Sequence, residues 1–169
     1  ESLGTLLRAT LSNKKPLVSL DYEIGLAGSY MTIQKIRFED RLLFHVECPE
    51  ELGKALILPL TIQPLLENAI RYGMEEMMDT CEISIRTMKG GGLLIVEVSN
   101  EGSVFEDGLL EKLQAGTKNA HGFGIGLVNI HQRIQMLFGE AYGLSFKNEN
   151  EKAIAIITIP YKTEEDDYA

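Results

Sequence analysis

The sequence predicts an α/β two-layer sandwich, in which a mixed, mostly antiparallel sheet is covered on one face by about three helices, with further helices at the N-terminus. Two observations carry this prediction. Apolar residues recur at helical spacing in residues 20–38, 62–73 and 125–138. Alternating or continuous apolar segments, typical of strands, separate these helices and follow the last of them.

Composition narrows the class of protein. The chain has 169 residues, 44% hydrophobic and 24% charged, which suits one well-packed domain. A formal net charge of −9 without a cluster of Lys or Arg argues against a nucleic-acid partner. Cys48 and Cys81 lie far apart and outside any zinc-site spacing, which favours a reducing compartment. No apolar run approaches the ~18 residues of a membrane span, and the missing initiator Met indicates a piece of a longer protein.

Two helices are expected first. Leucines recur at helical spacing in residues 1–12, and a broad apolar stripe follows in residues 20–38. That stripe comprises Leu20, Ile24, Ala27, Tyr30, Met31, Ile33 and Ile36. Gly25 and Gly28 each weaken a helix interior by up to ~1 kcal/mol, which a closely packed neighbour would explain.

Strands are expected on both sides of the central helix. Residues 41–47 alternate, and a lone His such as His45 inside a strand is more often structural or solvated than catalytic. Residues 83–87 and 93–98 flank three glycines and predict a hairpin. The second strand is apolar on both faces, so we expect a central strand that is covered on both sides.

The segment 63–73, QPLLENAIRYG, combines core packing with chemistry on one helix. At ~100° per residue, its apolar face comprises Ile62, Leu65, Leu66, Ala69 and Gly73. Thr61 is the expected N-cap, which places Pro64 in the first turn, where it has no intrahelical bond to lose. Gly73 is the expected C-terminal stop.

The polar face of this helix carries Gln63, Glu67, Asn68 and Arg71. Asn68 and Arg71 are three residues apart, so both can contact one anionic or metal-bound ligand, whereas Glu67 diverges from Asn68 by about a quarter-turn. The alternative is an ordinary surface helix with a solvated pair of Glu67 and Arg71.

Two further stretches suit a binding site. Residues 99–102 form a polar turn at the end of a strand, and residues 103–120 are a long connection of the kind that forms lids. Gly122, Gly124 and Gly126 then precede a helix, and their small size lets backbone N–H groups approach an anion at the positive helix end. A flexible hinge is the alternative interpretation.

In order and spacing, these motifs resemble the ATP-binding catalytic domain of bacterial sensor histidine kinases. That domain belongs to the GHKL or Bergerat-fold superfamily, with gyrase, the MutL proteins and the Hsp90 chaperones. The most similar subgroup has an N box that reads QPLxENAxxxG and a second glycine box that reads GxGLxNxxxR. Here residues 63–73 and 124–133 match these boxes, and the resemblance covers roughly residues 20–160.

The resemblance implies ATP and Mg²⁺ as cofactors. Asn68 would coordinate the Mg²⁺ that bridges the ATP phosphates, Arg71 would face the phosphates, and Tyr72 would flank the nucleotide. Glu67 is the candidate catalytic residue, which would polarise a water or orient Arg71. The other expected nucleotide-binding residues are Asn100, Gly102, Gly122, Gly124, Ile125, Gly126 and Leu127.

Two segments depart from the superfamily pattern. The motif Asp-x-Gly-x-Gly aligns on residues 100–104, so the adenine-binding Asp is Asn100 and the second Gly is Val104. An Asn oxygen can accept from the adenine amino group, but without the charge that strengthens such a bond. Lys152 and Ala153 stand where Gly-Thr usually precedes the last strand, so the affinity for adenine is open.

The resemblance also implies an organisation. Residues 1–38 would lead from an upstream dimerisation and phosphoacceptor region, residues 39–162 would form the ATP-binding domain with final strands at 142–147 and 153–159, and 163–169 would be a solvated acidic tail. The full-length protein would be a membrane-bound homodimer whose cytoplasmic part transfers the γ-phosphoryl group to an upstream His, outside this chain, and then to a response regulator. Alternatives are a degenerate scaffold domain, and an ATPase or protein-serine kinase.

Overall fold

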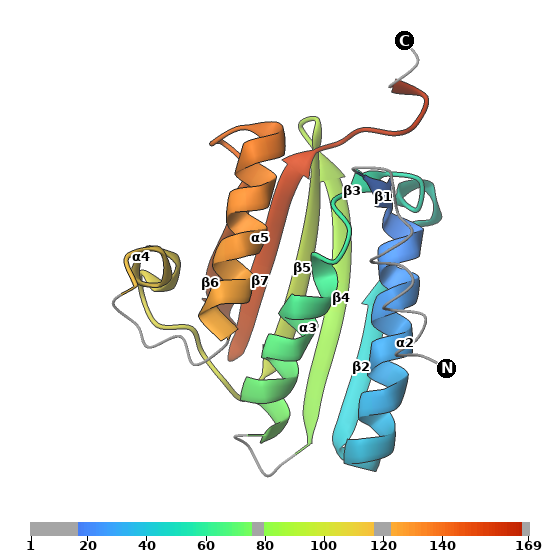
Figure 1. Ribbon diagram of the computed structural model, residues 1–169. Helices are drawn as coiled ribbons and strands as arrows, with labels where there is room; N and C mark the ends of the chain where they lie inside the picture. The colour runs from blue at the N-terminus through green and yellow to red at the C-terminus, as the bar shows by residue number, and fades with distance from the viewer. Residues whose placement is uncertain (1–16, 76–79, 117–122, 167–169) are drawn as a thin grey trace.

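A five-stranded sheet forms the centre of the computed structural model, which describes residues 17–75, 80–116 and 123–166 (Figure 1). The strand order is β2-β4-β5-β7-β6, with β2 parallel to β4 and the other neighbours antiparallel. The strands are β2 (Leu42–Glu47), β4 (Cys81–Gly90), β5 (Leu93–Glu101), β6 (Gly143–Glu149) and β7 (Lys152–Pro160). The helix expected over residues 1–12 lies outside the described residues.

Three helices cover one face of this sheet, which confirms the predicted two-layer sandwich (Figure 1). They are α2 (Leu20–Phe38), α3 (Ile62–Ile70) and α5 (Phe123–Phe138). Ser19 caps α2, because its hydroxyl accepts from the Tyr22 N–H at 3.2 Å. Smaller elements are the paired strands β1 (Val18–Ser19) and β3 (Leu56–Ile57), the short helix α4 (Leu109–Gln114) and the 3₁₀ turns Glu39–Arg41 and Glu50–Leu52.

Tight turns set the register of the antiparallel strands. β4 and β5 are joined by Gly91 and Gly92, whose φ angles of 59° and 78° suit the two-residue turn that the glycine run predicts. Asn150 and Glu151 join β6 to β7 with φ angles of 51° and 62°. Two adjacent residues with positive φ are what a type I′ hairpin requires, even without glycine.

Strand β5 is central, as predicted, but helices cover only one of its faces. Leu94, Val96 and Val98 are buried against the helices, whereas Ile95 and Glu97 on the opposite face are half-buried. The expectation of cover on both faces is wrong. An apolar run shows that a strand lies inside a sheet, but here no second layer of helices packs on the described part of the chain (Figure 1).

The helices bury narrower stripes than their sequences indicate. Ile33 and Ile36 of α2 are 40% and 77% exposed, and Leu137 of α5 is 45% exposed. The reason is that a helix on a sheet buries only the side that rests on it. A Cβ atom added at Gly25 or Gly28 would meet nothing within 4 Å, so the prediction that a closely packed neighbour explains these glycines is wrong.

His131 joins α5 to the edge strand β6. Its Nδ1 accepts from the Leu144 N–H at 3.0 Å, and the ring is buried. A Cβ atom at Gly143 would clash with this Nδ1, so Gly143 makes room for the ring. An acceptor nitrogen must carry no proton, and burial lowers the pKa of His131.

Acid is expected to weaken the fold through His131. Because its folded-state pKa is lowered from 6.5, its contribution to the unfolding free energy is complete above pH 6.5 and is lost as the pH falls through the folded-state pKa. The slope is at most ~1.4 kcal/mol per pH unit. Urea unfolding at about pH 7.5 and about pH 5.5 measures the loss. His131→Gln should remove this pH dependence and His45→Gln, at an exposed site, should keep it; an unchanged pH dependence in His131→Gln contradicts the assignment.

Candidate functional site

Helix α3 begins where the sequence predicts, but a different side chain caps it. Thr61 precedes the first helical residue, yet its backbone is already helical (φ −101°, ψ −35°) and its hydroxyl donates to the Leu58 carbonyl at 2.9 Å. The N–H groups of Leu60, Thr61 and Ile62 instead donate to the Glu23 carboxylate at 2.8, 3.1 and 3.3 Å. Thr61 thus occupies the N-cap position, as predicted, but its side chain does not cap the helix, because two carboxylate oxygens from α2 satisfy more donors than one hydroxyl.

Glu23 is a functional candidate that the sequence reasoning missed. Glu23 shares the buried face of α2 with Leu20, Ala27 and Met31. A charged residue within an apolar stripe is the sequence feature that could have identified it. Its side chain is 2% exposed. Burial raises the pKa of the Glu23 carboxyl, while the three N–H donors and Arg133 oppose that rise.

Arg133 approaches the same turn from α5. Its Nη2 donates to the Pro59 carbonyl at 3.0 Å, one residue before the amides that Glu23 accepts. The last residue of the second glycine box thus contacts the segment that leads into the N box. Helices α2, α3 and α5 therefore meet at residues 58–62.

The polar face of α3 is less exposed than predicted. Asn68 is buried, at 3% exposure, although the sequence places it with the outward residues. Glu67 is half-buried and accepts from Gln63 Nε2 at 3.1 Å, which fixes its carboxylate along the helix. Arg71 and Tyr72 follow the helix, with the Arg71 Cζ 6.0 Å from the centre of the Tyr72 ring. A buried amide beside half-buried charged groups suits a ligand site better than a solvated helix face.

Gly73 does not stop the helix as predicted. Regular α3 ends at Ile70 and continues as a π-helical turn, Arg71–Glu75, that contains Gly73. A Cβ atom at this glycine would lie 2.6 Å from the Cys81 Sγ and 3.3 Å from the Asn100 Nδ2. Glycine is therefore present for space, since the end of the N box packs directly on strands β4 and β5.

Asn100 lies buried at this junction, at the end of β5. Its Nδ2 donates to the Ser103 Oγ at 2.7 Å and to the Glu101 carbonyl at 3.1 Å. Both bonds engage the amide nitrogen, so the amide oxygen is the atom suited to accept from a ligand. Gly102 follows with φ 79°, which turns the chain out of the sheet.

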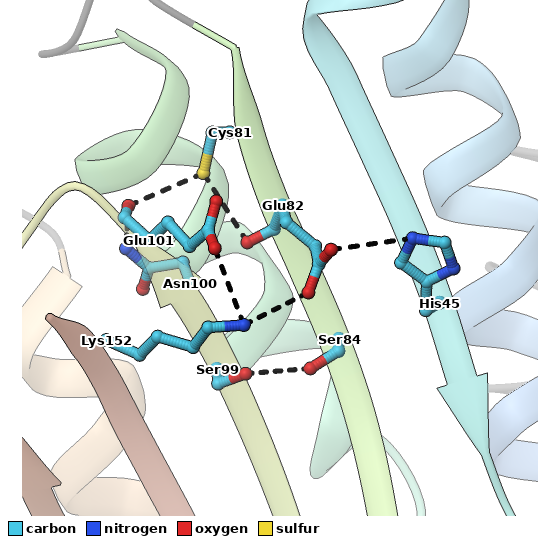
Figure 2. Close-up of polar contacts among 8 residues, drawn as sticks. All are labelled: His45, Cys81, Glu82, Ser84, Ser99, Asn100, Glu101 and Lys152. Carbon is cyan, nitrogen blue, oxygen red and sulfur yellow. Dashed lines mark hydrogen bonds and ion pairs between the residues drawn. The ribbon is translucent and has the colours of Figure 1, made fainter. Parts of the chain in front are cut away.

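Polar contacts on the open face of the sheet hold the strand ends beside Asn100 (Figure 2). Lys152 Nζ lies 3.0 Å from Glu82 Oε1 and 3.5 Å from Glu101 Oε1, and Glu82 Oε2 lies 3.7 Å from His45 Nε2. The hydrogen bond with Glu82 raises the pKa of Lys152, and the same bond lowers the pKa of Glu82. The two residues that replace Gly-Thr thus have different roles. Lys152 forms ion pairs on the open face of the sheet, and the buried Ala153 pairs with Asn100 on the adjacent strand.

The connection expected to form a lid, residues 103–120, is fixed near its start by the side chain of Asn148. The Asn148 side chain of β6 accepts from the Phe105 N–H and donates to the Phe105 carbonyl, both at 2.8 Å. The Phe105 ring packs edge-on against Phe146, with 4.9 Å between ring centres. The connection therefore leaves β5 along the edge strand before α4.

Helix α5 starts at Phe123, two residues earlier than predicted, so Gly124 and Ile125 lie in its first turn. The N–H groups of a first turn have no intrahelical acceptor and point toward the positive helix end. Gly126 is half-buried, and Leu127 is buried in the core. Gly122 lies outside the described residues.

Within residues 17–75, 80–116 and 123–166, no three His, Cys, Asp or Glu side chains gather as ligands for a metal ion. In the same described part of the chain, no helix has the length and apolar character to cross a membrane. Cys48 and Cys81 are free thiols, as the sequence indicates.

Comparison with known proteins places this arrangement in a family. Residues 53–163 match the family of histidine kinase-, DNA gyrase B- and HSP90-like ATPases, and residues 1–42 match the histidine kinase family. The sensor histidine kinase YesM of Bacillus subtilis (strain 168) is 42% identical over 165 residues, which are 97% of this chain and 27% of YesM. The chain thus spans about a quarter of that relative's length.

Solved structures show the same fold. The catalytic domain of histidine kinase ThkA superposes with a TM-score of 0.67 at 19% identity, covering 85% of this chain and 95% of that one. ThkA in complex with the response regulator protein TrrA gives a TM-score of 0.63 at 18% identity, covering 95% of this chain and 47% of that one. Since the ATPase match spans more than half of the chain, the protein belongs to the family of histidine kinase-, DNA gyrase B- and HSP90-like ATPases, as its N box and second glycine box indicate.

Proposed function

We propose that this chain binds ATP with Mg²⁺ and supplies the γ-phosphoryl group for autophosphorylation of a His upstream in a full-length sensor histidine kinase. The observation that carries the proposal is the junction of the N box with β5: Gly73 packs against Asn100, and Asn68 of the same N box is buried. Membership of the ATPase family supports the ATP-binding part. The histidine kinase match at residues 1–42 supports the connection to a phosphoacceptor region.

Each side chain has a proposed role. Asn68 is the metal-facing residue, Arg71 binds phosphate oxygens, and Tyr72 flanks the nucleotide. Glu67, which Gln63 holds in place, polarises a water or orients Arg71. Adenine lies at Asn100 and Gly102, and the second glycine box binds the phosphates through backbone N–H groups, with Gly122, Gly124, Ile125, Gly126 and Leu127 as its residues.

The donor set fits Mg²⁺. This ion keeps several waters and takes oxygen ligands largely from substrate phosphates, so it needs few protein groups. One buried amide oxygen, from Asn68, is such a ligand. When bound, Mg²⁺ would neutralise phosphate charge, while the chain's own residues position the nucleotide.

The proposal extends to the parent protein. We propose that the parent protein is a homodimeric sensor, which segments upstream of this chain anchor in the membrane. This chain lies in its cytoplasmic part, and the parent passes the phosphoryl group to a response regulator. ThkA, which has the same fold, has been solved with the response regulator protein TrrA, and this supports the choice of partner. We propose residues 1–38 as the connection to the phosphoacceptor helices and residues 163–169 as a solvated tail.

A scaffold domain without kinase activity is the second candidate. It is favoured by Asn100 and Val104 in the first glycine box and by Ala153, where the superfamily carries Asp, Gly and Thr. Asn100 can offer adenine only an uncharged acceptor. The two candidates differ in one measurable property, since only the catalytic domain must bind nucleotide.

Restoring the acid of the first glycine box is expected to tighten nucleotide binding. Asn100→Asp replaces a neutral acceptor with a charged one, and charge-assisted hydrogen bonds are roughly twice as strong. The change gives up the bond from Nδ2 to the Glu101 carbonyl, while the new oxygen can accept from the Ser103 hydroxyl. We expect about tenfold tighter MgATP binding, or ~1.4 kcal/mol, by calorimetry. The matched control is Asn148→Asp, which adds the same charge at the lid anchor and should not tighten binding. Weaker binding in an Asn100→Asp variant whose unfolding free energy equals that of wild type would contradict the adenine assignment.

The test of the proposed function is autophosphorylation of the full-length parent. We expect the labelled γ-phosphoryl group of ATP to appear in the protein and to be lost in mild acid but stable in base, as for phosphohistidine. Acid-stable label would instead indicate a protein-serine kinase, and phosphate release without labelled protein would indicate an ATPase. Either result overturns the proposal.

A further inference from the structure

The N-terminus of α3 is held by a residue from outside the ATPase part of the chain. Glu23 lies on α2, within the residues 1–42 that match the histidine kinase family, whereas the ATPase match begins at residue 53. Its carboxylate accepts from the three backbone N–H groups of Leu60, Thr61 and Ile62 across 37 to 39 residues of sequence. Without α2, these donors would lose their partner at a largely buried helix end.

We infer that Glu23 is a positioning residue of the nucleotide site, which sets the place of Asn68 by fixing the helix that carries it. Asn68 lies nearly two turns along α3 from the amides that donate to Glu23, and a regular helix transmits a shift of its first turn to the whole element. The inference rests on the proposed function, because it concerns how Asn68 meets the Mg²⁺ of bound ATP.

Two contacts around the same turn support a role in position rather than in packing alone. Arg133 of α5 donates to the Pro59 carbonyl, so the turn is held from both neighbouring helices. The Thr61 hydroxyl donates to the Leu58 carbonyl and offers α3 no cap of its own. Glu23 is therefore the side chain that satisfies the start of the N-box helix, and α2 and α5 share the same fixed point.

A double-mutant cycle in the 169-residue chain tests this inference. Calorimetry measures ATP affinity with Mg²⁺ and with EDTA for wild type, Glu23→Gln, Asn68→Ala and the double variant. Glu23→Gln keeps the side-chain shape but replaces one acceptor oxygen with a donor. We expect about tenfold weaker MgATP binding in Glu23→Gln, within the range of a lost helix cap, and a smaller loss in metal-free ATP binding, since Arg71 and Tyr72 follow the same helix.

The outcome turns on additivity. If Glu23 acts through Asn68, adding Glu23→Gln to Asn68→Ala changes MgATP affinity by less than about twofold. Full additivity, or an equal loss with Mg²⁺ and with EDTA, overturns the inference, because a general loss of stability affects both. Glu51→Gln, an exposed acid-to-amide change, is the matched control and should bind as wild type.

Two further results keep the test decisive. If circular dichroism shows that Glu23→Gln does not fold, Arg133→Gln is used instead, since it loosens the same turn from an exposed position. Arg133→Gln must then weaken MgATP binding when Asn68 is present and change it by less than about twofold in the Asn68→Ala background. Failure of wild type to bind MgATP defeats the proposed function, whereas wild-type binding that depends on Asn68 together with an additive Glu23 effect defeats only this inference.

Discussion

Asn68→Ala is expected to abolish the Mg²⁺-dependent tightening of ATP binding. Asn68 is buried on α3 and supplies a hard, neutral oxygen of the kind that Mg²⁺ accepts. If Asn68 is a ligand as proposed, its removal would leave the ATP–Mg²⁺ complex with phosphate and water ligands alone. We expect a loss in MgATP affinity at least as large as the roughly 10- to 100-fold that removing a residue behind a metal ligand costs. Calorimetric titration with ATP in Mg²⁺ and in EDTA measures the effect as the ratio of the two dissociation constants.

Two variants frame that result. Asn68→Asp keeps an oxygen at the same position and should retain Mg²⁺ dependence, since carboxylates are also Mg²⁺ ligands. Gln132→Ala removes an exposed amide side chain from α5 and should leave both affinities unchanged. If Asn68→Ala still tightens with Mg²⁺ as the wild type does, Asn68 is not at the metal.

Gly73→Ala is expected to lower the unfolding free energy by ~1–3 kcal/mol, the usual cost of added volume in a packed interior. Its Cβ would meet the Cys81 Sγ at 2.6 Å and the Asn100 Nδ2 at 3.3 Å. Relief of the contact must move the buried thiol, the end of the N box or Asn100, so nucleotide affinity should fall as well. Urea unfolding followed by circular dichroism measures the stability.

The cause is testable within the same chain. Cys81→Ala in the Gly73→Ala background removes the nearest atom and should recover part of the loss, which gives a favourable coupling energy. Gly28→Ala is the matched control, because a Cβ there meets nothing within 4 Å in the interior of α2. It should stabilise the protein by up to ~1 kcal/mol. Destabilisation of equal size in both glycine variants would show that space beside Cys81 is not the reason for Gly73.

The fold was predictable because its signals are local. The helix expected over residues 20–38 has those bounds in α2, and the glycine run marks the turn between β4 and β5. Local patterns do not show which element packs on each face of a strand or helix. The apolar run of β5 does not indicate that helices cover only one face of the strand, and the apolar stripe of α2 does not indicate that Ile36 is 77% exposed.

The candidate site was predictable as a set of motifs but not as a set of contacts. Thr61 has the residue type and position of an N-cap, yet Glu23 performs that role from 38 residues away. Gly73 has the position of a helix stop, yet the neighbouring thiol of Cys81 explains it better. Both errors have one origin, since rules for caps and stops describe one chain segment while the structure satisfies those groups through tertiary contacts.

The departure at Lys152 and Ala153 also becomes intelligible in three dimensions. The Lys152 side chain joins Glu82 and Glu101 on the open face, and Ala153 pairs with Asn100 on the adjacent strand. The substituted pair thus maintains the sheet beside Asn100. The affinity of this strand end for adenine distinguishes the two candidates, because a catalytic domain must bind nucleotide and a scaffold need not.

Calorimetric titration of the 169-residue chain with MgATP, and with ADP for comparison, tests the central claim most directly. A catalytic domain must bind the nucleotide that supplies its phosphoryl group. We therefore expect saturable binding of one nucleotide per chain, with a dissociation constant below about 1 mM. No binding of either nucleotide at millimolar concentration would contradict the account and leave the scaffold as the function of this fold.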